Sequence, residues 1–260
     1  MPKRIYKKYK FKNNLLLPTI IIISILIIWQ SLTIILNLPK WLLPAPSAIL
    51  IEIYTNFPLL ITHSLVTIQE VLFGFLLALG LGIALAISID TSQIVEKTIY
   101  PLIITSQTIP IIAITPLLLV WVGYGIFTKI IVVALISFFP IVVNMIDGLR
   151  STDNSIEKVA LTLGATKLQI LRLIRIPSSI PYLFSGMKIG ISVSVIGAVI
   201  GEWVGASSGL GYLMLQAAPR FQTTLVFASI VFLSIMGLSL FAFIQIIEYR
   251  FTKWNRFSSN

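Results

Sequence analysis

The side chains that perform chemistry in proteins are scarce in this chain of 260 residues. It has no cysteine, which excludes disulfides, thiolate metal sites and cysteine nucleophiles. Its one histidine, His63, stands apart from other ligands, and a metal site needs several, so we expect no bound metal. There is no nucleotide-binding glycine loop, and the apolar segments offer no Ser/His or paired Asp set for catalysis. The sequence therefore favours a protein that is not an enzyme.

A few polar groups within apolar segments are candidates for binding a solute. Gln107 and Thr108 lie in one such segment, and Glu202 and Trp203 end another. A carboxylate at membrane depth is costly and is a functional candidate for that reason, while an indole can stack on an aromatic ring. Glu202 has an alternative of equal weight, in which it is solvated or hydrogen-bonded within the glycine-rich segment that follows it. Glu70 is expected to face protein or the membrane interface.

The composition indicates the elements that carry these groups. Only 11% of the residues are charged, whereas a soluble domain carries roughly 25%. The apolar residues form runs of about 20, the length that a helix needs to cross a hydrocarbon core. We therefore expect an all-α polytopic membrane protein. The predicted spans are 15–36, 64–89, 99–121, 126–146, 182–203 and 222–246.

The net charge of +10 is concentrated on one side of these spans. Fifteen of the 19 lysines and arginines fall in segments that six crossings place together, which is the distribution that marks the cytoplasmic side. We thus expect a multi-pass protein of the cell membrane with both termini cytoplasmic, the lipid bilayer as its surroundings, and no nucleic-acid partner. The predicted organisation is a basic cytoplasmic N-terminal tail (1–14), a first transmembrane helix (15–36), an extracytoplasmic segment (37–62), a transmembrane core (63–246) with a cytoplasmic loop (147–181), and a cytoplasmic tail (247–260).

Prolines predict irregular backbone in two regions. Three of them extend the chain near residue 40, before a short helix from 48 to 56 that Ser47 would cap. Others are expected to interrupt the third and fourth spans, and broken membrane helices face protein or a water-lined cavity. Kinks that merely shape packing are the alternative. The interrupting residues are Pro101, Pro110, Pro116 and Pro140.

The loop 147–181 has the pattern of a helical hairpin. Apolar residues from Ile156 to Leu163 recur with helical spacing, Asn154 would cap this helix with Glu157 as its reciprocal partner, and Gly164 would end it. A capping box at 166–169 opens a second helix, which Pro177 and Pro181 would terminate.

This predicted hairpin has a small-residue face, made by Ala160, Gly164 and Ala165. Small side chains let another protein's backbone approach closely, so the face favours docking of a protein. A helix lying on anionic lipid is the alternative, because the loop also carries basic residues.

The stretch from Glu157 to Ala165, followed by Ile176-Pro177, resembles the cytoplasmic loop of ABC importer permeases of the binding-protein-dependent type I family. There the motif reads Glu-Ala-Ala, with glycine four residues after the second alanine; Lys158 and Val159 depart from it here. The resemblance implies that the first hairpin helix docks into a groove of a separate ABC ATPase. The implied docking residues are Glu157, Ala160, Gly164 and Ala165.

The run from Gly201 to Tyr212 resembles the subfamily that serves nitrate, sulfonates, taurine and pyrimidine precursors of thiamine, and 132–150 looks most like its hydroxymethylpyrimidine branch. The resemblance implies a second permease copy forming a homodimer, two ABC ATPase subunits and an extracytoplasmic substrate-binding protein. ATP and Mg would be bound by the ATPase, with no cofactor in this chain.

Two other classes are weighed against this interpretation. A secondary transporter driven by an ion gradient would show inverted repeats or paired broken helices, and no repeat is visible. An intramembrane enzyme lacks its catalytic set. A sulfonate, taurine or nitrate permease is the alternative within the family.

Overall fold

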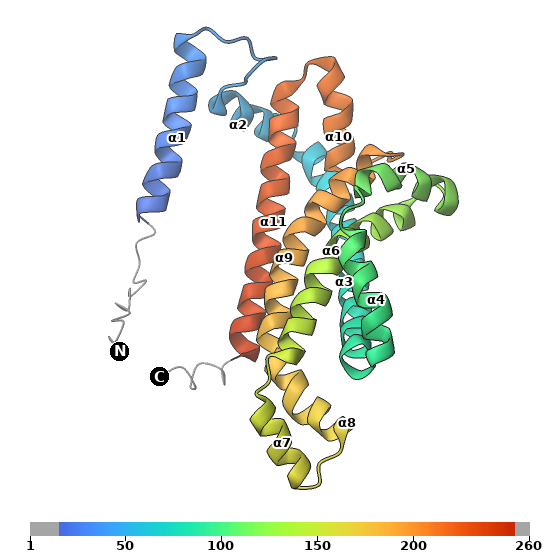
Figure 1. The fold of residues 1–260 in the computed structure, drawn as a ribbon. Coiled ribbons are helices and arrows are strands. Elements are labelled where there is room, and N and C mark those ends of the chain that lie inside the picture. Colours follow the sequence, from blue (N-terminus) through green and yellow to red (C-terminus); the bar gives the residue numbers. More distant parts are fainter. Residues whose placement is uncertain (1–15, 253–260) are drawn as a thin grey trace.

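The chain folds into a bundle of long helices in the computed structural model, which describes residues 16–252 (Figure 1). No strand occurs in that range, as expected for the all-α class. The basic segment 1–14 and the last residues of the tail lie outside the described residues. The helices are α1 (Leu16–Ile35), α2 (Pro46–Thr55), α3 (Phe57–Thr91), α4 (Gln93–Ser106), α5 (Ile111–Val122), α6 (Ile126–Arg150), α7 (Asn154–Thr162), α8 (Lys167–Ile170), a π-turn (Leu171–Arg175), α9 (Ile176–Trp203), α10 (Leu210–Ala217), a 3₁₀ turn (Ala218–Arg220) and α11 (Thr223–Phe251).

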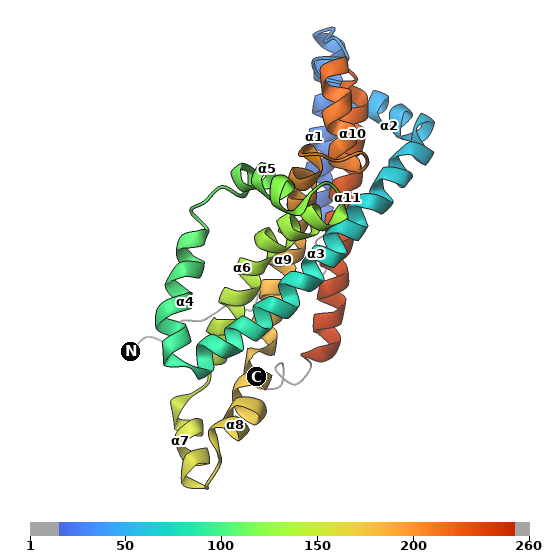
Figure 2. The same ribbon diagram turned by 90° about the vertical axis from the view of Figure 1, so that its right-hand side faces the viewer.

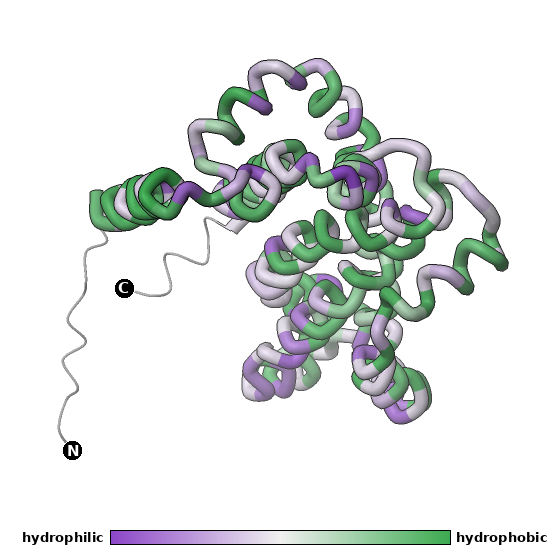
Figure 3. The backbone as a smooth tube through the Cα atoms, turned by 90° about the horizontal axis from the view of Figure 1, so that it is seen from above, coloured by the Kyte–Doolittle hydropathy of each residue, from purple (hydrophilic) through white to green (hydrophobic). Residues whose placement is uncertain are grey.

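The described helices confirm the prediction of about six spans. Five are long and apolar enough to cross a membrane, and the pair α4–α5 makes a sixth if it is counted as one broken span. Hydrophobic residues make up much of the helical stretches, interspersed with shorter hydrophilic ones, in the view from above (Figure 3). Side chains of α1 are almost all exposed, so the apolar surface of this helix faces away from the core.

The third predicted span, 99–121, is not one helix. It is divided into α4 and α5, whose axes are bent by 105°, with Pro110 directly before α5 (Figure 2). The expectation that Pro101, Pro116 and Pro140 interrupt helices is wrong. Each lies within a continuous helix, in α4, α5 and α6 respectively. Two of these prolines also accept side-chain hydrogen bonds at their own carbonyls: Thr105 donates to the carbonyl of Pro101, and Asn144 to that of Pro140.

The predicted short helix before the second span exists as α2, but Ser47 does not cap it. Ala45 holds the N-cap position, because the helix begins one residue earlier with Pro46 at its first position. Ser47 instead contacts the side chain of Gln30 in α1: its hydroxyl accepts from Gln30 Nε2, and its backbone N–H donates to Gln30 Oε1.

The core is centred on α6 and α9, which pack along much of their lengths. Glycines on one face of α9 let the backbones approach, because a Cβ there would meet α6 at about 3 Å. Small residues serve this purpose in membranes, where close packing drives helix association. These glycines are Gly186, Gly190, Gly197 and Gly201.

Together α6 and α9 connect the two ends of the bundle. The hairpin α7–α8 projects beyond one end, while α2 and α10 lie at the other (Figures 1 and 2).

Candidate functional site

The hairpin α7–α8 is built by local signals at each turn. Asp153 caps α7 by accepting a hydrogen bond from the Ser155 N–H, and this bond lowers the pKa of the Asp153 carboxyl. The predicted cap at Asn154 is therefore wrong by one residue. Asn154 is already helical, because the aspartate before it supplies the acceptor that the first turn needs.

Gly164 ends the first hairpin helix as predicted. Its φ of +84° is left-handed, a conformation that a side chain opposes. The Ala165 N–H donates to the carbonyl of Ala160, and the Gly164 N–H to that of Leu161, which together form the Schellman arrangement. The turn thus reverses the chain while satisfying two carbonyls at the end of α7.

The second hairpin helix begins as predicted but does not end where predicted. Thr166 and Gln169 form a reciprocal capping box at the start of α8. The helix then continues through the π-turn and α9, so that 167–203 is one unbroken helical stretch. Pro177 and Pro181 do not terminate it. The wider π-turn directly before Pro177, in which the Ile176 N–H bonds to the Leu171 carbonyl, relieves the clash that a proline makes with the preceding turn.

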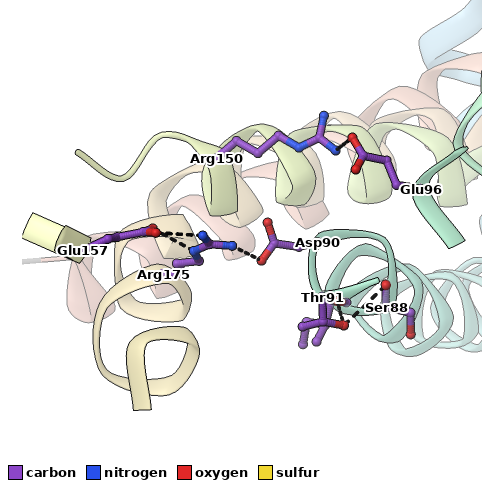
Figure 4. A network of polar contacts seen from close by, with 8 residues as sticks. Ser88, Asp90, Thr91, Glu96, Arg150, Glu157 and Arg175 are labelled. Atoms are coloured by element: carbon purple, nitrogen blue, oxygen red, sulfur yellow. Dashed lines mark hydrogen bonds and ion pairs between the residues drawn. The ribbon is translucent and has the colours of Figure 1, made fainter. Parts of the chain in front are cut away.

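An ion cluster fixes the hairpin to the transmembrane helices (Figure 4). Arg175 donates from Nε and Nη2 to the two carboxylate oxygens of Glu157, both at 2.7 Å, and from Nη1 to Asp90 at 2.8 Å. Hydrogen bonds from Arg175 hold the pKa of Glu157 below its ordinary value. Because Asp90 lies near the end of α3, the cluster joins α7, the π-turn and α3.

A second ion pair braces the same end of the bundle. Arg150, the last residue of α6, donates to Glu96 of α4 at 2.7 Å, and its guanidinium lies over the Tyr100 ring. Both partners are about 40% exposed, so this pair is weak compared with the cluster at Arg175.

The residues exposed on the hairpin surface are not all those that the sequence predicts for docking. Ala160 and Ala165, predicted to form the docking face, are half-buried, and Glu157 is turned inward to Arg175. Apolar residues of α7 and of its C-cap are exposed instead: Ile156 by 54%, Val159 by 60% and, at the C-cap, Leu163 by 82%. Their helical spacing was visible in the sequence, but the pattern does not say that this face lies away from the bundle. An exposed apolar stripe on a projecting element is typical of a docking surface.

Glu202 lies at the opposite end of the bundle, where it is fully buried. Its carboxylate accepts from the Thr67 hydroxyl and from the N–H groups of Gly211 and Tyr212. Thr67 in turn accepts from Leu210 N–H, and His63 from Gly209 N–H. The first N–H groups of α10, which have no acceptor within the helix, thereby all find one in these side chains.

This geometry matches the structural alternative for Glu202, in which it is hydrogen-bonded within the glycine-rich segment. Gly209 is part of the arrangement, because a Cβ there would collide with the Glu202 carboxyl group. Glu70, expected to face protein or the interface, is fully buried in protein.

The four residues predicted to line a pathway do not form one site. Gln107 and Thr108 are exposed at the break between α4 and α5, and Trp203 is 41% exposed beside the buried Glu202. No hydrogen bond or ion pair joins the two groups within residues 16–252.

The family described as "Binding-protein-dependent transport system inner membrane component" matches residues 78–253 of this chain. A probable ABC transporter permease protein of Haemophilus influenzae is 38% identical over 240 residues. The aligned region covers 92% of this chain and 98% of the relative's length.

Two further relatives are named for particular cargoes. The formylaminopyrimidine transport permease protein ThiX of Halalkalibacterium halodurans is 38% identical, covering 92% of this chain and 96% of its own. The putative aliphatic sulfonates transport permease protein SsuC of Bacillus subtilis is 31% identical, covering 95% and 89%.

Among solved structures, the inward-facing MetNI methionine ABC transporter superposes with a TM-score of 0.68 at 19% identity. The match covers 76% of this chain and 99% of that chain.

Proposed function

Because this chain belongs to the family of binding-protein-dependent inner membrane transport components, as an ABC importer permease of type I, we propose that it imports a pyrimidine precursor of thiamine. The relatives named for a cargo differ in their solutes, and their sequence identities to this chain favour the pyrimidine. A relative named for formylaminopyrimidine shares 38% of residues along nearly the whole chain, against 31% for one named for sulfonates.

The hairpin α7–α8 is the feature that carries the proposed mechanism. It projects from the bundle, it exposes the apolar stripe Ile156, Val159 and Leu163, and it is held to α3 by the Arg175 cluster (Figure 4). A rigidly attached apolar projection can transmit a push from a docked protein into the membrane helices. We place the ATPase on this stripe, with Gly164 shaping the turn and with Glu157, Ala160 and Ala165 supporting it from the inner side.

The family of this chain supports a set of partners. We propose two ABC ATPase subunits, which bind ATP and Mg, an extracytoplasmic substrate-binding protein and a second copy of this permease. The hairpin end then faces the cytoplasm, together with both termini. The exposed polar groups Gln107 and Thr108, at the bend between α4 and α5, and the ring of Trp203 are proposed to lie along the pathway of the solute.

Reconstitution tests the cargo and the coupling together. The permease, its ATPase and its binding protein are placed in proteoliposomes, and ATP-dependent uptake of labelled hydroxymethylpyrimidine is compared with uptake of taurine and of an alkanesulfonate. We expect uptake of the pyrimidine alone. Uptake of a sulfonate without the pyrimidine would refute the cargo and leave the transporter class in place.

A further inference from the structure

A cavity of about 560 Å³ lies where α6 begins and α9 ends, away from the hairpin, and the coupling described above does not use it. Its volume falls within the roughly 300–1,000 Å³ of small-molecule sites. Its walls come from α3, from the start of α6 with the turn before it, and from the glycine-rich segment after α9. The residues of that segment that border the cavity, 205–208, are all small.

Two opposite charges border this cavity. Glu70 of α3 is fully buried, and Lys129 of α6 is 7% exposed; the Lys129 Nζ lies 3.1 Å from Glu70 Oε1. Apart from the Lys129 ammonium, no group within the described residues donates a hydrogen bond to the Glu70 carboxylate. This contrasts with Glu202 close by, whose oxygens accept from Thr67 and from two backbone N–H groups.

The pair therefore has unused hydrogen-bonding capacity. An ionised carboxylate offers about four acceptor positions and an ammonium three donors. A buried charge with unsatisfied positions is costly, and it is retained most readily where a ligand completes it. Glu202 also lies close enough to interact with Glu70, so the two carboxyl groups and the single ammonium offer no net positive charge to an anionic ligand.

We propose that this cavity is where the permease holds its cargo, and that it takes a planar nitrogen heterocycle whose edge carries an amino group beside a ring nitrogen. The amino group donates to Glu70, and the ring nitrogen accepts from Lys129. Tyr124, which borders the cavity and is 80% exposed, offers an aromatic face for stacking. The inference rests on the proposed pyrimidine cargo and names the groups that would recognise it.

The test compares two cargoes in the same reconstituted transporter. Hydroxymethylpyrimidine bears the ring amino group, and its analogue carries hydrogen there. The ratio of their uptake efficiencies is measured for the wild type and for Glu70→Gln. Because the binding protein is the same in both, a change in the ratio reports the permease. Loss of a charge-assisted hydrogen bond should lower the ratio by about tenfold. Glu248→Gln removes a half-buried ion pair with Lys188 that does not border this cavity, and it should leave the ratio unchanged.

The charge-swapped double variant Glu70→Lys/Lys129→Glu separates recognition from packing. It restores an ion pair between α3 and α6 but reverses donor and acceptor. We expect insertion and detergent stability near the wild type, with uptake of the aminopyrimidine lost. Wild-type uptake and selectivity in this variant would show that the pair is purely structural and would overturn the proposal.

Ser207→Trp provides a variant that spares the buried pair, because Ser207 is an exposed residue of the cavity wall. An indole there should obstruct the cavity and reduce uptake of the pyrimidine at least about tenfold, with ATPase association unchanged. If Ser207→Trp and Glu70→Gln both keep wild-type uptake and selectivity, the site is wrong while the pyrimidine cargo stands. If the wild type itself does not import the pyrimidine, both proposals fall.

Discussion

Arg175 holds both carboxylate oxygens of Glu157 across 18 residues of sequence, with two hydrogen bonds of 2.7 Å. Parallel N–H donors matched to a carboxylate give this contact a fixed direction, which a single ammonium could not supply. Because the third donor reaches Asp90 of α3, one side chain sets the angle of the hairpin against a membrane helix.

Replacing Arg175 by lysine should uncouple ATP hydrolysis from transport. Lysine keeps the charge but cannot bridge Glu157 and Asp90 in the same geometry, at a cost of roughly 1–2 kcal/mol to the attachment of the hairpin. We expect ATPase subunits still to copurify, and uptake per ATP hydrolysed to fall several-fold. Arg172→Lys is the matched control, since Arg172 is exposed and forms no ion pair within residues 16–252. Equal coupling in the two variants would contradict the role given to Arg175.

A charge on the exposed stripe of α7 should block docking of the ATPase. Val159→Asp places a carboxylate where an apolar interface is proposed, and we expect binding of the ATPase to weaken by about tenfold or more. Asn154→Asp introduces the same charge on the opposite side of this helix and should bind normally. Affinity of detergent-purified permease for the ATPase measures both, and equal affinities would place the docking surface elsewhere.

Replacing Gly164 by alanine should modestly destabilise the hairpin, because its backbone is left-handed. Alanine in the left-handed conformation costs about 1–2 kcal/mol, although the space around Gly164 is open. Gly164→Ala should therefore increase hydrogen exchange in 154–170. Gly80→Ala also enters open space, but in a helical backbone, and should leave exchange unchanged or slower. Unaltered exchange in Gly164→Ala would refute the strain argument.

The start of α10 should be more sensitive to substitution than an equally strained turn elsewhere. Gly209→Ala combines a positive φ with a collision against Glu202, whereas Gly123→Ala has a positive φ and open space. Overpacking adds typically 1–3 kcal/mol, so the thermal midpoint in detergent should fall clearly further for Gly209→Ala. Similar midpoints would show that Glu202 adapts without cost.

The orientation can be tested cleanly because the chain has no cysteine of its own. Single cysteines at Lys158, in the hairpin, and at Arg220, at the other end of the bundle, are both exposed. A thiol reagent that cannot cross the membrane should label Arg220→Cys and spare Lys158→Cys in intact cells. The reverse labelling would invert the orientation proposed above.

Local signals in the sequence predicted much of the fold, and they failed where a distant neighbour decides the outcome. Thr166 and Gln169 satisfy each other within one turn, so their capping box could be recognised directly. The predicted end at Pro177 is wrong because a π-turn precedes this proline and the helix continues, and a π-turn has no sequence signature.

The candidate site was predictable to a similar degree. The periodicity from Ile156 to Leu163 identified an apolar face, but its direction depends on Arg175 and Asp90, far along the chain. Glu70 and Lys129 are 59 positions apart, and nothing in the spacing indicates that α3 and α6 bring them together.

The unbroken helical stretch 167–203 has a mechanical consequence. At 1.5 Å per residue, its 37 residues form a connecting rod of about 55 Å. Arg175 lies near one end of this stretch and Glu202 near the other. The hairpin and the start of α10 are therefore both attached to the same helix. A displacement of the hairpin along this axis reaches the far side of the membrane without an intervening joint. The π-turn, which ends at Arg175, is the one segment of this stretch that is not α-helical.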